Sequence, residues 1–408
     1  MTTTIFRLLV LVTTAIGMAP NSAQASTAGR IRGKTVSAVI PAWARKYNGN
    51  CSMCHSPAVP RLNARGIQFK WAGYRMPEEI GENADVTKLQ DYFAARTRIQ
   101  YQFEKAQGEA TETNGFSVEN VSLFVGGAIG KSYGGLVELE RAADGEVEAI
   151  VAASAVWGTE RRFGGLRAGQ GHMLVLGGGV AGFDRAIGIS RPIPFSTSNT
   201  AVPLNLGGDL AGAEAFFVVG SNRTSVQLVN AVGGEGAGAG STSKDIVVTN
   251  QYMWDAAGAG IGAAAYFGST KGLAAEAADE RSRYSRVVLT ANKYLGNFEA
   301  LGGYVLSRDR DLPVGDEFAR ARVNGQGFWF SGQYTFRPSP LTLFSRWEVR
   351  DPDGDADNDA DRRFVVGGVL PVNLPEFLRL AIEYRRDLPQ GGLRPRRNEL
   401  AAEFQMTF

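Results

Sequence analysis

The 408-residue sequence is poor in cysteine and histidine, with two of each, and it carries almost no net charge. A structural zinc site needs about four such ligands close together, so the sequence excludes one. A formal net charge of +2 gives no general reason to expect a nucleic-acid partner. We also find no phosphate-binding loop, no serine nucleophile in an elbow and no carboxylate pair whose spacing alone marks catalysis. These absences leave few classes of soluble enzyme.

No apolar run is long enough to cross a bilayer as a helix, which takes about 20 residues. The longest, Leu8–Ala19, follows Arg7 and precedes Ala23-Gln24-Ala25, an A-x-A cleavage site. This is the pattern of an export signal. We therefore expect residues 1–25 to be removed and the mature chain to begin near Ser26 in an oxidising compartment.

Both cysteines lie in one pentapeptide, Cys51-Ser52-Met53-Cys54-His55. C-x-x-C-H is the attachment signature of c-type haem. Cys51 and Cys54 would form thioether bonds to the porphyrin, and His55 would be the proximal iron ligand. A structural disulfide and a thioredoxin-like redox pair are the alternatives, but the latter expects a βαβ setting, which is not found here.

The residues around this motif suit a small monohaem module covering residues 26–88. Candidate pocket residues are the aromatic side chains that can cover a macrocycle and the arginines that can meet its propionates: Trp43, Tyr47, Phe69, Trp71, Tyr74, Arg45 and Arg61. The alternative is an aromatic cluster that forms its own core, although a core of about 50 residues is marginal alone.

Met76 is the candidate sixth ligand, because a thioether opposite imidazole raises the haem potential. The alternatives are that Met76 only packs, that His172 or Lys70 ligates the iron, or that the site is open.

From Leu89 onward the apolar residues recur with a period of two, which indicates strands with two differently solvated faces. The first runs through Phe93–Phe103. The pattern recurs near 117–130, 133–143, 147–157, 163–170, 211–220, 224–232, 245–256, 258–268, 284–295, 297–308, 325–337, 340–350, 362–372, 376–386 and 397–408. About sixteen strands are therefore expected.

The predicted connections alternate between short turns and long loops, the latter at 233–244, 269–283, 309–324, 351–361 and 387–396. Outer-membrane barrels have this arrangement, with periplasmic turns and extracellular loops. The chain also ends on Phe408, whose alternating strand resembles the recognition signal of such barrels. Because strands span a bilayer only as a closed barrel, we predict an all-β, antiparallel barrel at 89–408 in the bacterial outer membrane, with the N-terminal module plugging its lumen.

Three further features invite functional interpretation. Asp351, Asp353, Asp355, Asp357, Asp359 and Asp361 alternate through one predicted extracellular loop. Such alternation resembles calcium loops, and the alternatives are a solvated acidic loop or a collector of Fe(II). The long segment 171–210 is expected to constrict the lumen or cap its outer mouth. Lumen arginines that could bind propionates or serve as ordinary lumen charges are Arg96, Arg98, Arg346, Arg350, Arg379, Arg385 and Arg386.

The sequence resembles the fused outer-membrane cytochrome–porins, which include the iron-oxidising outer-membrane cytochromes of iron-oxidising bacteria. The resemblance rests on residues 41–47, the haem motif, residues 60–63 and residues 73–77, with a barrel of porin size behind them. It implies one haem c on Cys51 and Cys54 with His55 as proximal ligand. It also implies electrons entering from outside and a periplasmic cytochrome or similar carrier receiving them.

The expected function is therefore an electron conduit in the outer-membrane bilayer that takes electrons from extracellular Fe(II). The alternatives are outward electron export to extracellular metal, a diffusion porin with a structural or sensory haem plug, and a peroxidase-like enzyme with an open iron site. Whether the chain is an enzyme in the strict sense stays open, because the one-electron chemistry would belong to the cofactor.

Overall fold

The structure is a computed structural model, and it describes most of the chain after residue 40. The described residues are 41–108, 112–171, 187–196, 200, 202, 204, 206–208, 210–230, 244–271, 281–314, 317–337, 339–356, 359–371, 378–390 and 395–408. The predicted export signal and the rival ligand His172 lie outside them. Among the described helices, none is both long and apolar enough to cross a membrane.

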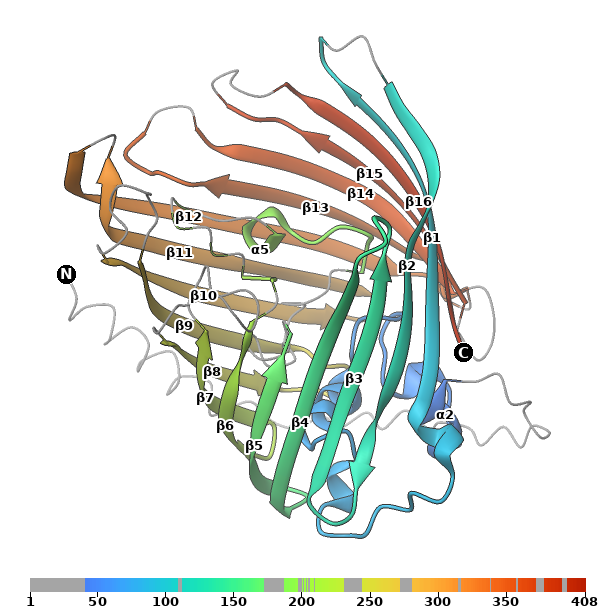
Figure 1. The fold of residues 1–408 in the computed structure, drawn as a ribbon. Helices are drawn as coiled ribbons and strands as arrows, with labels where there is room; N and C mark the ends of the chain where they lie inside the picture. The colour runs from blue at the N-terminus through green and yellow to red at the C-terminus, as the bar shows by residue number, and fades with distance from the viewer. Residues whose placement is uncertain are drawn as a thin grey trace. The chain divides into compact units, whose positions relative to one another are not determined.

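Sixteen antiparallel strands close into a barrel, in which each strand pairs with its neighbours in sequence and β1 pairs with β16 (Figure 1). The strands are β1 Phe93–Ala106, β2 Glu112–Ile129, β3 Tyr133–Ala142, β4 Val147–Thr159, β5 Arg162–Gln170, β6 Ala211–Val219, β7 Asn222–Asn230, β8 Lys244–Met253, β9 Gly260–Lys271, β10 Arg281–Leu295, β11 Phe298–Val314, β12 Glu317–Thr335, β13 Thr342–Asp351, β14 Asp361–Pro371, β15 Leu378–Asp387 and β16 Arg397–Thr407. The predicted fold class and strand number are confirmed.

The two faces of the wall differ as the alternation predicts. On β7, Val226 and Leu228 are 49% and 54% exposed, whereas Ser225 and Gln227, which alternate with them, are buried. Apolar side chains therefore point outward and polar ones inward, which is the arrangement of a barrel in lipid.

One predicted loop is wrong. Residues 309–324 were expected to connect two strands, but β11 continues to Val314 and β12 begins at Glu317. The paired strands run on through Arg310, which faces Arg322. Charged residues interrupt the apolar alternation in this part, and the sequence pattern therefore did not show the strands.

Before the barrel, residues 41–92 form short helices: α2 Ala42–Lys46, η1 Cys51–Met53, α3 Ala64–Trp71, η2 Pro77–Glu79 and η3 Leu89–Tyr92. We call these residues the N-terminal segment; in Figure 1 it is the blue ribbon beside β3 and β4. Trp43 Nε1 donates to the carbonyl oxygen of Gly126 on β2 at 3.1 Å, and Arg61 forms an ion pair with Glu299 of β11. The segment therefore meets the inner wall on widely separated strands.

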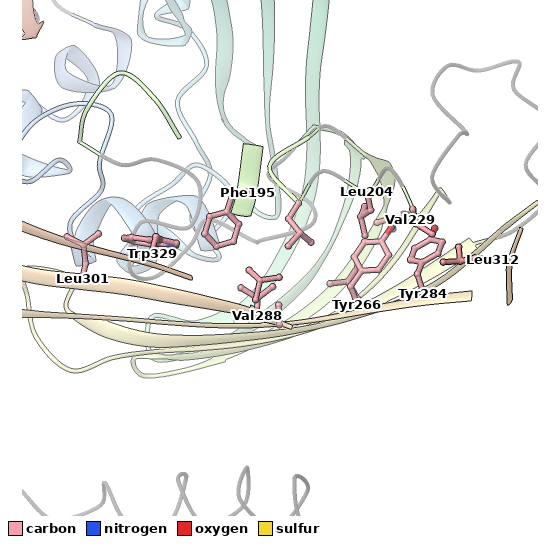
Figure 2. Packing of buried hydrophobic residues seen from close by; sticks show 14 residues of the cluster. Phe195, Leu204, Val229, Tyr266, Tyr284, Val288, Leu301, Leu312 and Trp329 are labelled. Atoms are coloured by element: carbon pink, nitrogen blue, oxygen red, sulfur yellow. The ribbon is translucent and has the colours of Figure 1, made fainter. Parts of the chain in front are cut away.

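A second segment lies against the inward faces of β10–β15. We call the described residues of 187–208 the inner segment; it contains α5, Ile193–Ser196, which contacts β12 and β13. Figure 2 shows Phe195 and Leu204 facing wall residues that include Val288 and Trp329. The Val202 amide donates to Asp309 at 2.8 Å. The described part of 171–210 therefore occupies lumen space, as predicted.

Candidate functional site

The predicted attachment and ligand residues share one cavity of about 280 Å³ between the N-terminal segment and the barrel wall. Cys51, Cys54, His55 and Met76 all line it. Its aromatic lining comes from Trp43, Tyr47, Phe69 and Tyr74, which pack together with ring centroids 5.0–6.2 Å apart. Residues far apart in the sequence thus enclose the C-x-x-C-H motif.

Three predicted pocket residues, Trp71, Arg61 and Arg45, are not among those that line the cavity. Trp71 is fully buried in a separate cluster with wall residues that include Val156 and Phe216. Residues two apart on a helix lie on different faces, so Phe69 faces the cavity while Trp71 anchors α3 to the barrel. Arg61 pairs with Glu299, and Arg45 donates to the carbonyl oxygen of Phe93 at 2.9 Å.

Asn63 fixes the shape of the C-x-x-C-H loop. It is the N-cap of α3, where its side-chain oxygen accepts from the Gly66 amide at 3.0 Å. Its side-chain amide donates to the carbonyl oxygens of Ser52 and Met53, both at 3.1 Å. Its backbone amide donates to the carbonyl oxygen of Cys54 at 2.9 Å. One residue therefore joins the motif to the start of the next helix.

Gly66 allows this close approach. A Cβ added there would collide with the Cys54 carbonyl oxygen and with the Leu62 side chain. Helix α3 therefore rests directly on the backbone of the motif, and only glycine fits at the contact.

The orientation of His55 is set by a backbone contact. Its Nδ1 lies 3.0 Å from the carbonyl oxygen of Arg61, and His55 also forms a β-bridge with Leu62. With the proton on Nδ1, this hydrogen bond directs the Nε2 lone pair to the opposite side of the ring. Ligating histidines are commonly held in this way by a carbonyl oxygen.

Met76 follows a sharp turn and is 2% exposed. Gly73 and Tyr74 both have left-handed backbones, with φ of 73° and 64°. A non-glycine residue in this region is uncommon and costs free energy. Arg75, also buried, donates to the carbonyl oxygens of Lys131 and Tyr133 at 2.7 and 2.5 Å, which fixes the turn to the β2–β3 connection.

Glu79 ties Met76 to the other side of the cavity. Its carboxylate accepts the Met76 amide at 2.9 Å and the Tyr47 hydroxyl at 2.7 Å. Burial and this hydrogen bond raise the pKa of Tyr47 well above its ordinary value. The phenol therefore remains a hydrogen-bond donor at physiological pH.

The chemistry of the cavity lining fits a c-type haem. Two thiols, an imidazole and a thioether face one aromatic cavity, and Cys51 and Cys54 are not joined in a disulfide. Burial raises the pKa of the Cys54 thiol. Over the part of the chain that the structure describes, no group of three or more His, Cys, Asp or Glu residues could hold a metal ion on its own.

The barrel wall also lines the cavity, with the apolar side chains of Phe124 and Leu136 and with several polar ones. Arg96 of β1, Glu138 of β3, Arg379 of β15 and the β16 residues Gln405 and Thr407 line it. The other predicted lumen arginines that lie in strands are elsewhere; Arg346, for example, donates to the carbonyl oxygen of Ser190 in the inner segment at 3.1 Å.

Solved structures share this barrel. The sequence matches no protein-family model, and no curated protein matches it either. The outer-membrane channel DcaP of Acinetobacter baumannii aligns with a TM-score of 0.56 at 10% identity, over 78% of this chain and 96% of that one. An anion-selective porin from Comamonas acidovorans gives 0.56 at 12% over 78% and 98%, and Salmonella typhi OmpF in complex with daunomycin gives 0.53 at 14% over 78% and 97%.

The fold is that of an outer-membrane porin barrel. At such low identity the likeness shows the fold alone, and it says nothing about the N-terminal motif. The prediction of an outer-membrane barrel is confirmed at this level.

The acidic loop remains a prediction. Asp353 donates its amide to Asp359 at 3.2 Å, and the Asp355 amide donates to Asp353 at 3.1 Å. Asp361 pairs with Arg350 at 3.1 Å, and the Gln326 side chain donates to Asp351 at 3.2 Å. Asp357 lies outside the described residues. The described carboxylates thus bind amides and a guanidinium, and no metal cluster is found among them.

The sequence analysis assigned no structural role to Asn63, Gly66, Arg75 and Glu79, which shape the site. Asn63 carried a usable signal, because asparagine before a helical stretch is a common N-cap. Arg75 and Glu79 gave none, since their roles depend on partners in the barrel and across the cavity.

Proposed function

We propose that the protein is an outer-membrane electron conduit with one covalently attached haem c. The observation that carries the proposal is the single cavity that gathers Cys51, Cys54, His55 and Met76 inside a porin-type barrel. The resemblance of residues 41–77 to fused cytochrome–porins supports the same assignment.

In this proposal each residue has a defined task. Cys51 and Cys54 would hold the haem through thioether bonds, and His55 and Met76 would bind its iron. When bound, the haem supplies a one-electron site, and the protein supplies its placement and potential. Asn63 and Glu79 hold the two ligand-bearing loops, and the aromatic lining excludes water from the cavity.

Extracellular Fe(II) is the proposed electron donor, and a periplasmic soluble cytochrome or similar carrier is the proposed acceptor. Ferric iron precipitates near neutral pH, so oxidising the metal outside the cell keeps the precipitate out of the periplasm. The same arrangement could run outward, toward extracellular metal. A high haem potential favours uptake and a strongly negative one favours export.

The porin fold supports a second candidate, a diffusion porin in which the haem is a structural plug or sensor. Against it stand the two segments that occupy lumen space. The N-terminal segment contacts β2 and β11, and the inner segment contacts wall residues that include Asp309 and Glu383. Low conductance of the holoprotein in planar bilayers would argue for the conduit, and an open pore would argue for the porin.

The direct test uses the holoprotein in outer-membrane vesicles, with Fe(II) added outside and the haem absorption followed in time. Reduction of the ferric haem within seconds is expected. If Fe(II) leaves the haem oxidised while dithionite reduces it, iron oxidation is the wrong function and the porin or export alternatives take its place.

A further inference from the structure

We infer that the barrel wall forms half of the cofactor site, with Arg379 of β15 as the main anchor for the carboxylate edge of the haem and Arg96 of β1 as the second. The inference rests on the proposed function. The sequence offered Arg45, Arg61 and seven lumen arginines, Arg96 and Arg379 among them, as candidates for this task, and the geometry narrows the choice to these two.

The cavity has two unlike sides. The N-terminal segment supplies the sulfur atoms and most of the aromatic rings, together with Lys70 and Asn50. The barrel supplies Phe124 and Leu136 and also the arginines Arg96 and Arg379. A haem macrocycle is apolar except for the edge that carries its two propionates. A haem bound through Cys51, Cys54 and His55 would be stabilised most if its propionate edge faced the arginines of the barrel wall.

Arg379 is 4% exposed and lines the cavity. Its Nη1 donates to Glu403 at 2.5 Å, and its Nη2 donates to the carbonyl oxygens of Ile187 and Gly188 at 2.8 and 3.0 Å. Among the described residues its buried Nε–H has no acceptor. A buried donor without an acceptor calls for an explanation, and a carboxylate is the acceptor that a guanidinium binds best.

The charge of Arg96 is largely balanced by two carboxylates of β3. Its Nη2 donates to Glu138 at 2.7 Å, to Glu140 at 2.8 Å and to Ser122 at 2.9 Å, and the guanidinium lies over the Phe124 ring. Since two carboxylates already share this cation, we assign it the weaker role.

The arginines that do not line the cavity provide matched controls. Arg98 lies two residues from Arg96 on the same face of β1, and Arg385 lies six residues from Arg379 on the same face of β15. Arg98 approaches Glu140 and Glu403, and Arg385 pairs with Glu399. Replacing either arginine removes a cation from the lumen but changes no residue that lines the cavity.

The experiment measures the haem midpoint potential of purified holoprotein by redox titration of its absorption. A nearby cation disfavours the ferric state, so Arg379→Gln is expected to lower the equilibrium constant for reduction at least tenfold, which is 59 mV for a one-electron couple. Arg96→Gln is expected to lower it less, Arg379→Lys to restore most of the loss, and the controls Arg98→Gln and Arg385→Gln to shift it little.

A second variant separates the anchor from its partner. Arg379→Gln leaves Glu403 without its cation, which alone would lower the potential. The double variant Arg379→Gln with Glu403→Gln removes both charges, and the proposal predicts that its potential stays low. A potential that returns to the wild-type value, or an Arg379→Gln shift no larger than that of Arg385→Gln, overturns the anchor while leaving the conduit intact. A wild-type chain without covalent haem overturns both.

Discussion

The two segments inside the barrel are held by different sets of polar contacts. The N-terminal segment is attached mainly through backbone carbonyl oxygens: Trp43 donates to Gly126, Arg75 donates to Lys131, and Arg167 of β5 donates to Lys70 at 2.8 Å. The inner segment is attached through charged wall side chains. Glu383 accepts the Ile189 amide at 2.8 Å, and Glu348 accepts the Ile193 amide at 2.7 Å.

This difference gives the two segments separate roles: one shapes the cavity of the proposed haem site, and the other fills the lumen. The first segment is also buried by apolar clusters, so its position tolerates the loss of one polar contact. The second is also packed in an apolar cluster, through Phe195, Val202 and Leu204, and it meets carboxylates of β11, β13 and β15. We therefore expect changes in the cavity to affect the proposed haem site without opening the barrel, and changes in these carboxylates to raise conductance without removing the proposed haem.

The largest expected effect is the loss of the cofactor. Cys51→Ala with Cys54→Ala removes both thioether positions, and we expect no covalent haem on denaturing gels while the barrel still folds. Ser52→Ala, at the exposed position between them, is the control and should retain haem. Haem that stays covalently bound in the double variant would show that the motif is not the attachment site.

The inner segment should be released by one substitution. Glu383→Ala removes the acceptor of the Ile189 and Ser190 amides, and hydrogen bonds to charged groups contribute about 1.5–3 kcal/mol each. Conductance in planar bilayers is expected to rise several-fold, with the haem content unchanged. Glu399→Ala is the control. It removes the β16 carboxylate that pairs with Arg385, and it should leave conductance unchanged. Equal conductance in the two variants would contradict the assigned role of Glu383.

Gly66→Ala tests the contact between α3 and the haem motif. Alanine normally stabilises a helix relative to glycine, but here its Cβ meets the Cys54 carbonyl oxygen, and such overpacking costs about 1–3 kcal/mol. A lower yield of holoprotein and a lower melting temperature are expected. The control is Gly115→Ala, where a Cβ meets nothing within 4 Å. A stabilised Gly66→Ala variant would refute the close contact.

Tyr47→Phe removes one of the two hydrogen bonds to Glu79, which is worth about 1 kcal/mol. If Met76 is the distal ligand, its thioether-to-ferric-iron absorption should weaken and be lost at a lower temperature. Tyr304→Phe removes a 2.7 Å hydrogen bond to Gln326 on the barrel and serves as the control. An unchanged band in Tyr47→Phe would mean that Glu79 does not position the ligand.

The smallest effect is expected in the acidic loop. Asp353→Asn with Asp359→Asn changes a contact within one connection between β13 and β14. Haem potential and conductance should both stay at wild-type values. A changed rate of haem reduction by external Fe(II) would instead assign this loop a part in collecting the metal.

The predictable part of this molecule was local. Alternation with a period of two marked the strands, and the C-x-x-C-H pentapeptide marked the site, because both patterns lie in consecutive residues. Met76 and the aromatic residues around the motif followed from composition near it. Phe69 and Trp71 were assigned the same task, yet helical geometry turns Trp71 toward Val156 and Phe216 of the wall.

The unpredictable part depended on distant partners. Arg61 was a candidate for binding a propionate because it lies close to the motif in the sequence. In the structure it forms an ion pair with Glu299 of the barrel instead. Arg379 lies more than 300 residues from the motif, and no local pattern distinguishes it from Arg385. Residues 309–324 of β11 and β12 are rich in charged residues, so periodicity could not show the strands there.

The most direct test of the conduit is transfer of electrons across a sealed membrane. The holoprotein is placed in vesicles that contain an oxidised soluble cytochrome c and an impermeant ferrous chelator, and Fe(II) is added outside. The account predicts that the enclosed cytochrome is reduced while the chelator stays uncoloured, and that Cys51→Ala with Cys54→Ala abolishes the reduction. An enclosed cytochrome that stays oxidised, or a chelator that colours with iron that has entered through the barrel, would contradict it.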